Sequence, residues 1–293
     1  MTEQPNRIVA CKIVALVDGS IYSASVCDHA AWISGRTGAP VELVHVLGRR
    51  EAPDAQDHSG AIALGARTAL MEQLAELDAK RAKLISHRGR AILEDAQAIL
   101  NKAGVTEITT RLRHGDILET VAEIEADARV IVIGKRGAAA DFAKGHLGSN
   151  LERIVRASHK PVFIASRAFK PIAKALVAYD GGASAMKAVD HIARSPLFRG
   201  MAVHVVTVGS ATAEAVKGLE DAKAQLKAAG IEAETSILSG QPETTLCKLV
   251  EEDAQFDMLV MGAYGHSRIR SLIIGSTTTA MIRSCKVPVI LVR

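Results

Sequence analysis

The segment Met258–Arg293 decides the fold and reads MLVMGAYGHSRIRSLIIGSTTTAMIRSCKVPVILVR. A short apolar run ends at Gly262, a second glycine follows at Gly265, and nine further residues lead to Gly275-Ser276. Two glycines just past a strand let backbone approach a ligand without a Cβ between them. A Gly-Ser pair at the start of a helix leaves free N–H groups at the positive end of the helix dipole. The segment therefore predicts a strand, a phosphate-binding turn, a helix and a final strand.

An earlier segment, Ile131–Ser166, repeats this pattern as IVIGKRG…LGSNLERIVRASHKPVFIAS. Further upstream, Ile13–Gly19 aligns with Ala175–Gly181 at an offset of 162 residues, which falls to 127 or 128 near the ends of the two halves. A repeat of this length indicates two copies of one structural unit. The falling offset places about 35 extra residues in the first half, between its second and third strands.

Each half alternates apolar strands with helical segments. Strands are expected at Ile8–Val17, Val41–Leu47, Glu107–Arg113, Val130–Ile133 and Val162–Ala165, and again at Ala175–Tyr179, Ala202–Val208, Glu232–Leu238, Met258–Met261 and Val289–Val292. Helices are expected at Tyr22–Gly35, Ile62–Ala103, Ile117–Ala128, Ser149–Ser158, Ala183–Arg194, Ala211–Ala229, Glu243–Ala254 and Ser276–Cys285. This alternation predicts an α/β fold of two doubly wound domains, each with a parallel sheet. The domains span residues 1–167 and 174–293, and linker 168–173 contains the helix-breaking Lys170-Pro171.

Composition narrows the class of protein. The 293 residues suffice for two cores, and 48% are hydrophobic but only 3% aromatic, which favours parallel sheets covered by helices. A net charge of +4 without long basic runs gives little support for nucleic-acid binding. No stretch approaches the roughly 18 apolar residues of a membrane span. Four cysteines in apolar contexts, without metal-ligand spacing, predict buried free thiols in a reducing, cytoplasmic compartment; they are Cys11, Cys27, Cys247 and Cys285.

The extra residues of the first half read as an exposed loop followed by a long amphipathic helix. The apolar positions that follow a period near 3.6 are Leu70, Leu74, Leu77, Leu84, Ile92 and Ile99. Gly89 is expected to kink or divide this helix. Packing on the first sheet is preferred to a partner-binding role.

In an open α/β sheet, ligands bind at the carboxyl ends of strands where the strand order reverses. If each half has the order 3-2-1-4-5, the reversal brings Asp180, after strand one, next to Gly262, after strand four. Asp180 is a candidate acceptor for a ribose hydroxyl or an adenine amino group, and Ser276 with Thr277 adds hydroxyls near phosphate. The alternative is that the glycines shape a turn and Ser276 caps a helix. Nucleotide binding is preferred because these features occur together.

This order and spacing resembles the universal stress protein family, whose nucleotide-binding members carry G-x2-G-x9-G-(S/T) after strand four. The resemblance covers nearly the whole chain, once per half. It implies a Rossmann-like five-stranded sheet in each half, with ATP, and Mg²⁺ as an optional partner, in the crevice. It also implies pairing through the fifth strands, Val162–Ala165 and Val289–Val292, which commonly joins two such domains. A homodimer or higher assembly through fifth strands is expected. The implied second-half site consists of Ala178, Tyr179, Asp180, Val208, Gly262, Ala263, Gly265, His266, Gly275, Ser276 and Thr277.

The first half departs from the family spacing, because ten residues rather than nine separate Gly137 from Gly148. Lys135, Arg136 and Lys144 make its loop more basic than the second-half copy, which suits an anion. Three alternatives stay open: ATP, another phosphorylated ligand, or an empty structural copy. The less certain first-half candidates are Asp18, Val46, Gly134, Gly137, Gly148, Ser149 and Asn150.

Histidines give weaker signals. Satisfied buried rings are expected for His45 and His204, packing or a domain contact for the matching pair His29 and His191, and a place near phosphate for His114 and His266. No metal site is predicted, because His58, Asp54 and Asp57 lack diagnostic spacing.

The leading hypothesis is an ATP-binding, nucleotide-dependent stress-response regulator that holds ATP mainly in the C-terminal half. No GxxxxGK(S/T), Gly-x-Ser-x-Gly or HExxH motif occurs, so any enzyme activity is expected to be at most a weak ATPase. One alternative is an enzyme acting on a phosphorylated ligand. Another is an interaction module that binds an unknown protein partner without nucleotide.

Overall fold

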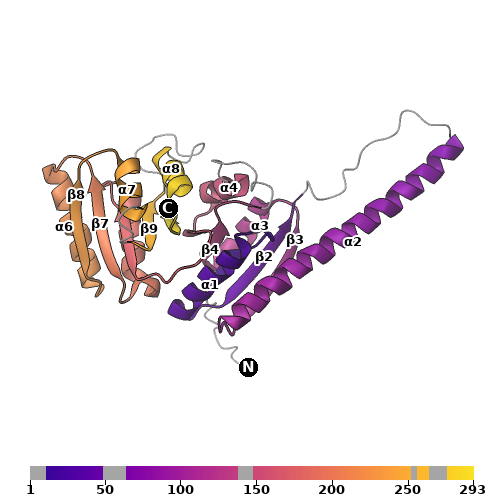
Figure 1. The fold of residues 1–293 in the computed structure, drawn as a ribbon, viewed down its shortest axis with the longest axis horizontal. Coiled ribbons are helices and arrows are strands. Elements are labelled where there is room, and N and C mark those ends of the chain that lie inside the picture. The colour runs from indigo at the N-terminus through magenta and orange to yellow at the C-terminus, as the bar shows by residue number, and fades with distance from the viewer. Residues whose placement is uncertain (1–10, 49–63, 138–147, 252–255, 264–275) are drawn as a thin grey trace, which may run out of the picture.

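The computed structural model describes residues 11–48, 64–137, 148–251, 256–263 and 276–293. Within these ranges, ten strands form one sheet in the order β3-β2-β1-β4-β5-β10-β9-β6-β7-β8 (Figure 1). The first-half strands are β1 (Lys12–Leu16), β2 (Val41–Leu47), β3 (Ile108–His114), β4 (Ala128–Gly134) and β5 (Val162–Ala165). The second-half strands are β6 (Lys174–Ala178), β7 (Ala202–Val208), β8 (Ala233–Leu238), β9 (Met258–Gly262) and β10 (Val289–Val292). Neighbouring strands within each half are parallel, which confirms the predicted order 3-2-1-4-5.

The two half-sheets are joined edge to edge through their fifth strands. β5 and β10 run antiparallel, with Phe163 opposite Ile290. On their other sides β5 pairs with β4 and β10 pairs with β9. Neither fifth strand therefore keeps an open edge, so the expected homodimer through these strands cannot form by strand addition. The fifth-strand pairing that the resemblance implied between two domains is confirmed, because the tandem chain itself supplies both strands.

Helices cover both faces of the sheet. One face carries α1 (Ser23–Thr37), α2 (Leu64–Lys102), α5 (Ala183–Arg194) and α6 (Ala213–Ala228), whose buried side chains share one core cluster. The other carries α3 (Ile117–Ile124), α4 (Ser149–Ala157), α7 (Pro242–Glu251) and α8 (Ser276–Ser284) over a second cluster. Short 3-10 helices lie at Glu125–Asp127 and Pro196–Phe198. The aliphatic strands thus bury both faces, as expected of parallel sheets.

The segment between the halves is packed against the core. Phe169 stacks edge-on against the buried His29 ring at 5.1 Å, and Ile172 is buried in the core cluster shared by α1 and α5. Arg36 at the end of α1 donates from Nε to the carbonyl of Leu197, 2.7 Å away in the second half. The two halves therefore contact each other through side chains as well as through β5 and β10.

Helix α2 differs from its prediction in two ways. It runs unbroken through Gly89. That glycine instead permits close packing, because a Cβ there would lie 2.8 Å from Leu112 Cδ1. The apolar stripe packs on the sheet only in its second part. Leu77 and Leu84 are 61% and 70% exposed, because this part of α2 extends beyond the sheet (Figure 1).

Candidate functional site

Each half places a carboxylate just after its central strand. In the first half β1 lies between β2 and β4, so Asp18 follows β1 where the strand order reverses. In the second half β6 lies between β7 and β9, and Asp180 takes the same place. This is the edge at which doubly wound sheets bind ligands.

In the first half the structure brings together residues more than a hundred positions apart. A Cβ built on Gly137 would lie 2.8 Å from Asp18 Oδ2. Gly148 donates its N–H to the carbonyl of Lys135 at 3.2 Å, and a Cβ on Gly148 would lie 3.5 Å from Gly137 N. The one-residue insertion between Gly137 and Gly148 therefore does not prevent the turn from meeting the start of α4.

The start of α4 has open backbone donors. Gly148 is its N-cap and supplies no side-chain cap, and Ser149 and Asn150 in the first turn are exposed. N–H groups at such a helix end carry a partial positive charge and favour an anion. Gly137 and Gly148 thus bring these donors close to Asp18, an arrangement that suits an anion.

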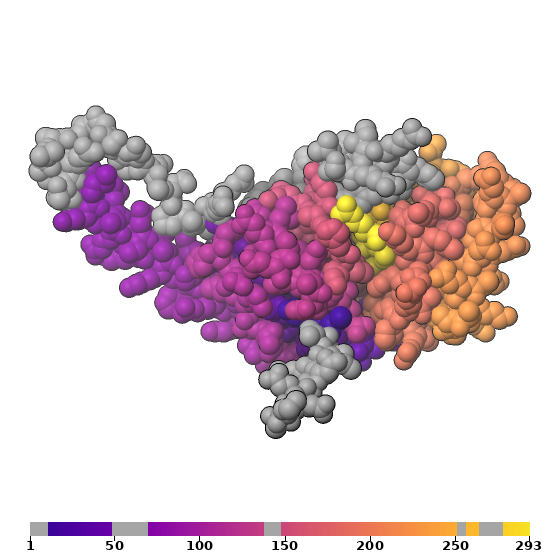
Figure 2. All heavy atoms as spheres, turned by 180° about the vertical axis from the view of Figure 1, so that it is seen from behind, coloured from indigo at the N-terminus to yellow at the C-terminus, as the bar shows by residue number. Residues whose placement is uncertain are grey.

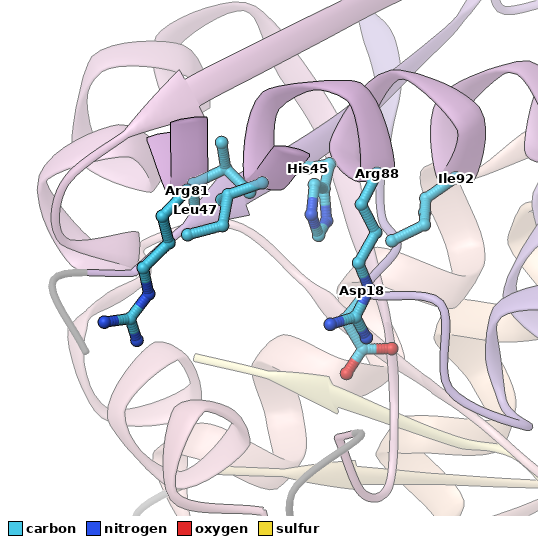
Figure 3. A pocket seen from close by; sticks show the side chains of 7 residues that line it. Asp18, His45, Leu47, Arg81, Arg88 and Ile92 are labelled. Atoms are coloured by element: carbon cyan, nitrogen blue, oxygen red, sulfur yellow. The ribbon is translucent and has the colours of Figure 1, made fainter. Parts of the chain in front are cut away.

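A hollow of about 230 Å³ adjoins Asp18 at the carboxyl ends of β1 and β2 (Figure 3). Pockets for whole ligands usually measure about 300–1,000 Å³, so this hollow suits one part of a ligand. Its lining is Asp18, His45, Leu47, Arg81, Ile85, Arg88 and Ile92. Four of these residues come from α2, and sequence reasoning missed them. The signal was available, because they continue the face of α2 that carries its apolar residues.

His45 and Arg88 give this hollow its polar character. The buried His45 ring contacts the carbonyl of Val17 through Nδ1 at 2.7 Å. Since a carbonyl can only accept, Nδ1 carries a proton in this contact. Arg88 extends from α2 toward Asp18 in Figure 3. The Asp18 carboxylate, the Arg88 guanidinium and the His45 ring therefore line the same hollow. By contrast, Val46 packs with the core on the other side of the sheet.

The second half is described in part. Asp180 is exposed and accepts from Gly182 N at 2.9 Å, whereas Tyr179 is buried and burial raises the pKa of its hydroxyl. Ala178 and Val208 are half-buried at the ends of their strands. Gly265, His266 and Gly275 lie outside the described residues. Ser276 and Thr277 form the first turn of α8.

Gly262 has a packing role that neither interpretation of the glycine turn predicted. A Cβ on Gly262 would lie 2.4 Å from the carbonyl carbon of Ser184, at the start of α5. Gly134 is its counterpart, and a Cβ there would lie 2.6 Å from Tyr22 Cβ, just before α1. Ala263 is buried and donates its N–H to Val292 O. Both strand-four glycines therefore let a helix start pack directly on the sheet.

Lys135 has a different role from the one expected of it. Its side chain is buried, and Nζ donates to the carbonyls of Cys285 and Val287 just beyond α8. In return, Arg293 Nη1 donates to the carbonyl of Arg156 at 2.7 Å, in the last turn of α4. Each candidate phosphate-seat helix is thus held at its carboxyl end by a cation from the other half. Lys144 lies outside the described residues.

For the remaining histidines and cysteines, some predictions are confirmed and one is wrong. His45 is a satisfied buried ring, and His204 is half-buried, with Nε2 2.9 Å from Ser236 Oγ. His29 packs between Phe163 and Phe169, as its packing role predicted. The prediction of buried cysteines fails at Cys11, which is exposed, whereas Cys27 and Cys285 are buried. His114 is exposed in the last position of β3.

The described residues show neither a metal-binding cluster nor a membrane-spanning helix. Among those residues no three histidine, cysteine or carboxylate side chains gather closely enough to hold a metal ion, and His58, Asp54 and Asp57 fall outside them. No helix in the described ranges is long and apolar enough to cross a membrane.

The whole chain matches known proteins. The model of the universal stress protein family matches it twice, over residues 11–166 and 171–293. The universal stress protein Slr1230 from Synechocystis sp. is 36% identical over 285 residues, which cover 96% of this chain and 99% of that protein. Among solved structures, a universal stress protein from Archaeoglobus fulgidus matches with a TM-score of 0.74 at 20% identity, covering 97% of this chain and 98% of that one. The protein PA1789 from Pseudomonas aeruginosa, of unknown function, matches with a TM-score of 0.60 at 14% identity, covering 97% and 92%. Both structural matches share the fold from end to end.

Proposed function

The chain belongs to the universal stress protein family, with two family domains in tandem, and on that basis we propose that it is an ATP-binding regulator of a stress response. ATP binds mainly in the C-terminal half, with Mg²⁺ accompanying its phosphates. ATP acts by binding two conformations, or two partner-binding states, with different affinity. A reducing cytoplasmic location is part of the proposal, supported by four cysteines that form no disulfide.

One observation carries the proposal of a nucleotide site. A strand-end carboxylate, a glycine turn and an uncapped helix start are far apart in the sequence and meet at one crevice in the first half. Acceptors for ribose or base beside donors for phosphate are the two recognition elements that a nucleotide requires.

The preference for the C-terminal half rests on spacing and exposure. The second half carries G-x2-G-x9-G-S without insertion, from Gly262 to Ser276. Asp180 is exposed at the end of β6, beside β9 and on the same edge as the start of α8. In the first half, Lys135 is committed to the α8 carbonyls, which removes one of the three cations that favoured an anion there.

Isothermal titration of the full chain with Mg-ATP, after removal of any copurified nucleotide, tests the proposal. Asp180→Ala should weaken the tighter site about tenfold or more, the cost of losing a charged hydrogen-bond acceptor. Asp18→Ala should leave the tighter site unchanged. Glu220→Ala, on the exposed face of α6, is the matched control. ATP binding that is absent at millimolar concentration, or equal in Asp180→Ala and wild type, would contradict the proposal.

A further inference from the structure

The two halves differ where the end of the central strand faces the covering helix. In the second half Tyr179 extends into this space, and its hydroxyl would lie 3.1 Å from a Cβ built on Gly218 of α6. In the first half the equivalent strand residue is the smaller Val17, and a hollow of about 230 Å³ lies beside Asp18 (Figure 3). ATP bound in the second half leaves this hollow without a role.

The wall that β2 gives to the hollow is polar and fixed. Thr207 of β7 donates from Oγ1 to the carbonyl of Tyr179 at 2.9 Å, and His45 of β2 contacts the equivalent carbonyl of Val17 through Nδ1 at 2.7 Å. His45 is 5% exposed and lines the hollow. A buried imidazole therefore stands in the first half where the second half has a threonine hydroxyl.

Helix α2 adds two guanidinium groups to the hollow. Arg81 and Arg88 lie about two turns apart on one face of α2, and both line it. The lining contains one carboxylate, that of Asp18, so guanidinium groups outnumber carboxylates there. Neither arginine has a hydrogen bond or an ion pair within the part of the chain that the structure describes. Two cations without such partners beside a hollow indicate a site for an anionic group.

Helix α6 carries the opposite charge at the equivalent position. The buried residues Leu93 of α2 and Leu219 of α6 align the two helices. On this alignment Glu214 replaces Arg88. Arg81 has no counterpart, because α2 has additional turns at its start, which project from the first half in Figure 2. An anionic group would thus be attracted by the helix in the first half and repelled by it in the second.

We propose that the first half binds a sugar bisphosphate, and that Arg88, assisted by Arg81, holds one of its two phosphates in the hollow. Phosphate suits this position because its oxygens accept paired hydrogen bonds from a guanidinium. The other phosphate lies at the start of α4, a position that rests on the proposed function. Asp18 lies between the two phosphates, since it lines the hollow and its Oδ2 would be 2.8 Å from a Cβ on Gly137. Its carboxylate accepts from a sugar hydroxyl.

Isothermal titration of the Asp180→Ala chain, in which the second site is weakened, tests this assignment with fructose 1,6-bisphosphate and fructose 6-phosphate. The bisphosphate should bind at least about tenfold more tightly, because its extra phosphate gains charge-assisted hydrogen bonds. Arg88→Glu gives α2 the charge of α6 and should remove this preference. Arg90→Glu is the matched control, because Arg90 is exposed on α2 and does not line the hollow. Circular dichroism and the unfolding midpoint establish that each variant is folded.

Equal affinities for the two sugars, or a preference that survives in Arg88→Glu, overturn the proposal. AMP that binds this chain more tightly than the bisphosphate, with the same affinity in Arg88→Glu, would place a base in the hollow and would also overturn it.

Mg-ATP titrated into the chain with Asp180 intact separates this inference from the proposed function. Mg-ATP binding that depends on Asp180, without binding of the bisphosphate, overturns the sugar bisphosphate site alone. Binding of the bisphosphate that depends on Arg88, without binding of Mg-ATP, supports the inference and contradicts the proposed ATP site.

Chemical protection locates the bound phosphate. Phenylglyoxal modifies exposed arginines, and mass spectrometry of peptides measures the modification of Arg88 and Arg90 separately. Fructose 1,6-bisphosphate should slow the modification of Arg88 and leave that of Arg90 unchanged, whereas fructose 6-phosphate should protect neither. Modification of Arg88 at the same rate with and without the bisphosphate would show that the second phosphate does not lie in the hollow.

Discussion

Helices α2 and α6 occupy equivalent places in the two halves and are seated on their sheets in the same way. Three buried residues at identical spacing hold each helix; they are Leu93, Ala96 and Leu100 in α2, and Leu219, Ala222 and Leu226 in α6. A glycine with positive φ follows the end of each, Gly104 at 86° and Gly230 at 76°. In their carboxyl-terminal parts, α6 and α2 therefore have the same buried positions and the same terminal glycine.

Toward their amino ends the two helices diverge, and the crevice walls change with them. Ile92 of α2 corresponds to Gly218 of α6, and Arg88 corresponds to Glu214. In the second half Tyr179 reaches the helix, so that a Cβ on Gly218 would lie 3.1 Å from its hydroxyl. In the first half Ile92 reaches the strand end, so that a Cβ on Gly19 would lie 2.8 Å from Ile92 Cδ1. The space between the end of the central strand and the helix is filled by the strand residue Tyr179 in the second half and by the helix residue Ile92 in the first. The helix also differs in charge, with Arg88 in α2 and Glu214 in α6.

Gly134 at the end of β4 and Gly262 at the end of β9 test most severely whether the two halves are equivalent. Gly262→Ala should cost about 3 kcal/mol of unfolding free energy or prevent folding, because the added Cβ meets backbone of Ser184. Gly134→Ala should cost less, since its close neighbour is the Tyr22 side chain. Urea unfolding followed by circular dichroism measures both.

Gly148→Ala is the matched control, because a Cβ there would have no neighbour closer than 3.5 Å. Its cost should stay below about 1 kcal/mol, the usual range for an N-cap change. If all three variants lost equal stability, the packing roles assigned to Gly134 and Gly262 would be wrong.

The matching histidines His29 and His191 allow the two halves to be compared through the pH dependence of stability. Burial lowers the pKa of His29 from 6.5 to about 4, and its Nε2 has no partner among the described residues. The folded state therefore holds His29 neutral, while the unfolded state protonates below pH 6.5. The contribution of His29 to the free energy of unfolding is therefore fully present above pH 6.5 and is lost as the pH falls toward 4. The expected loss between pH 7.5 and pH 5 is about 2 kcal/mol.

His29→Gln should remove that part of the pH dependence, measured by urea unfolding at the two pH values. His191 also has a pKa lowered to about 4 by burial, but its side chain is only half-buried, so His191→Gln should remove less. A wild-type slope retained in His29→Gln would contradict the assignment.

Sequence patterns predicted the scaffold well because strand and helix periodicity reports burial directly. The repeat placed Asp18 and Asp180 at equivalent strand ends, and the topology placed each at its crevice. The wall formed by Arg81 and Arg88 was missed because arginines on an amphipathic stripe resemble a solvated face in sequence. The partner of Lys135 was missed because its acceptors are backbone carbonyls in the other half, which no residue type reveals. The exposure of Leu77 and Leu84 was missed because periodicity shows which residues share a face, not where the sheet beneath them ends.

Lys135 and Arg293 each donate to carbonyls at the carboxyl end of a helix in the other half. Replacing them should have the smallest effect of these variants and tests coupling between the halves most directly. Lys135 is buried at the carboxyl end of α8, whereas Arg293 is exposed at the carboxyl end of α4. Lys135→Met keeps the length of the side chain but leaves the Cys285 carbonyl without this donor, and should cost about 1.5 kcal/mol. Arg293→Met should cost about 0.5 kcal/mol, because water replaces its donors. Amide hydrogen exchange should accelerate across α8 in Lys135→Met and across α4 in Arg293→Met. Exchange that accelerates only in the half that carries the substitution would show that the cations stabilise their own domains and do not hold the opposite helix.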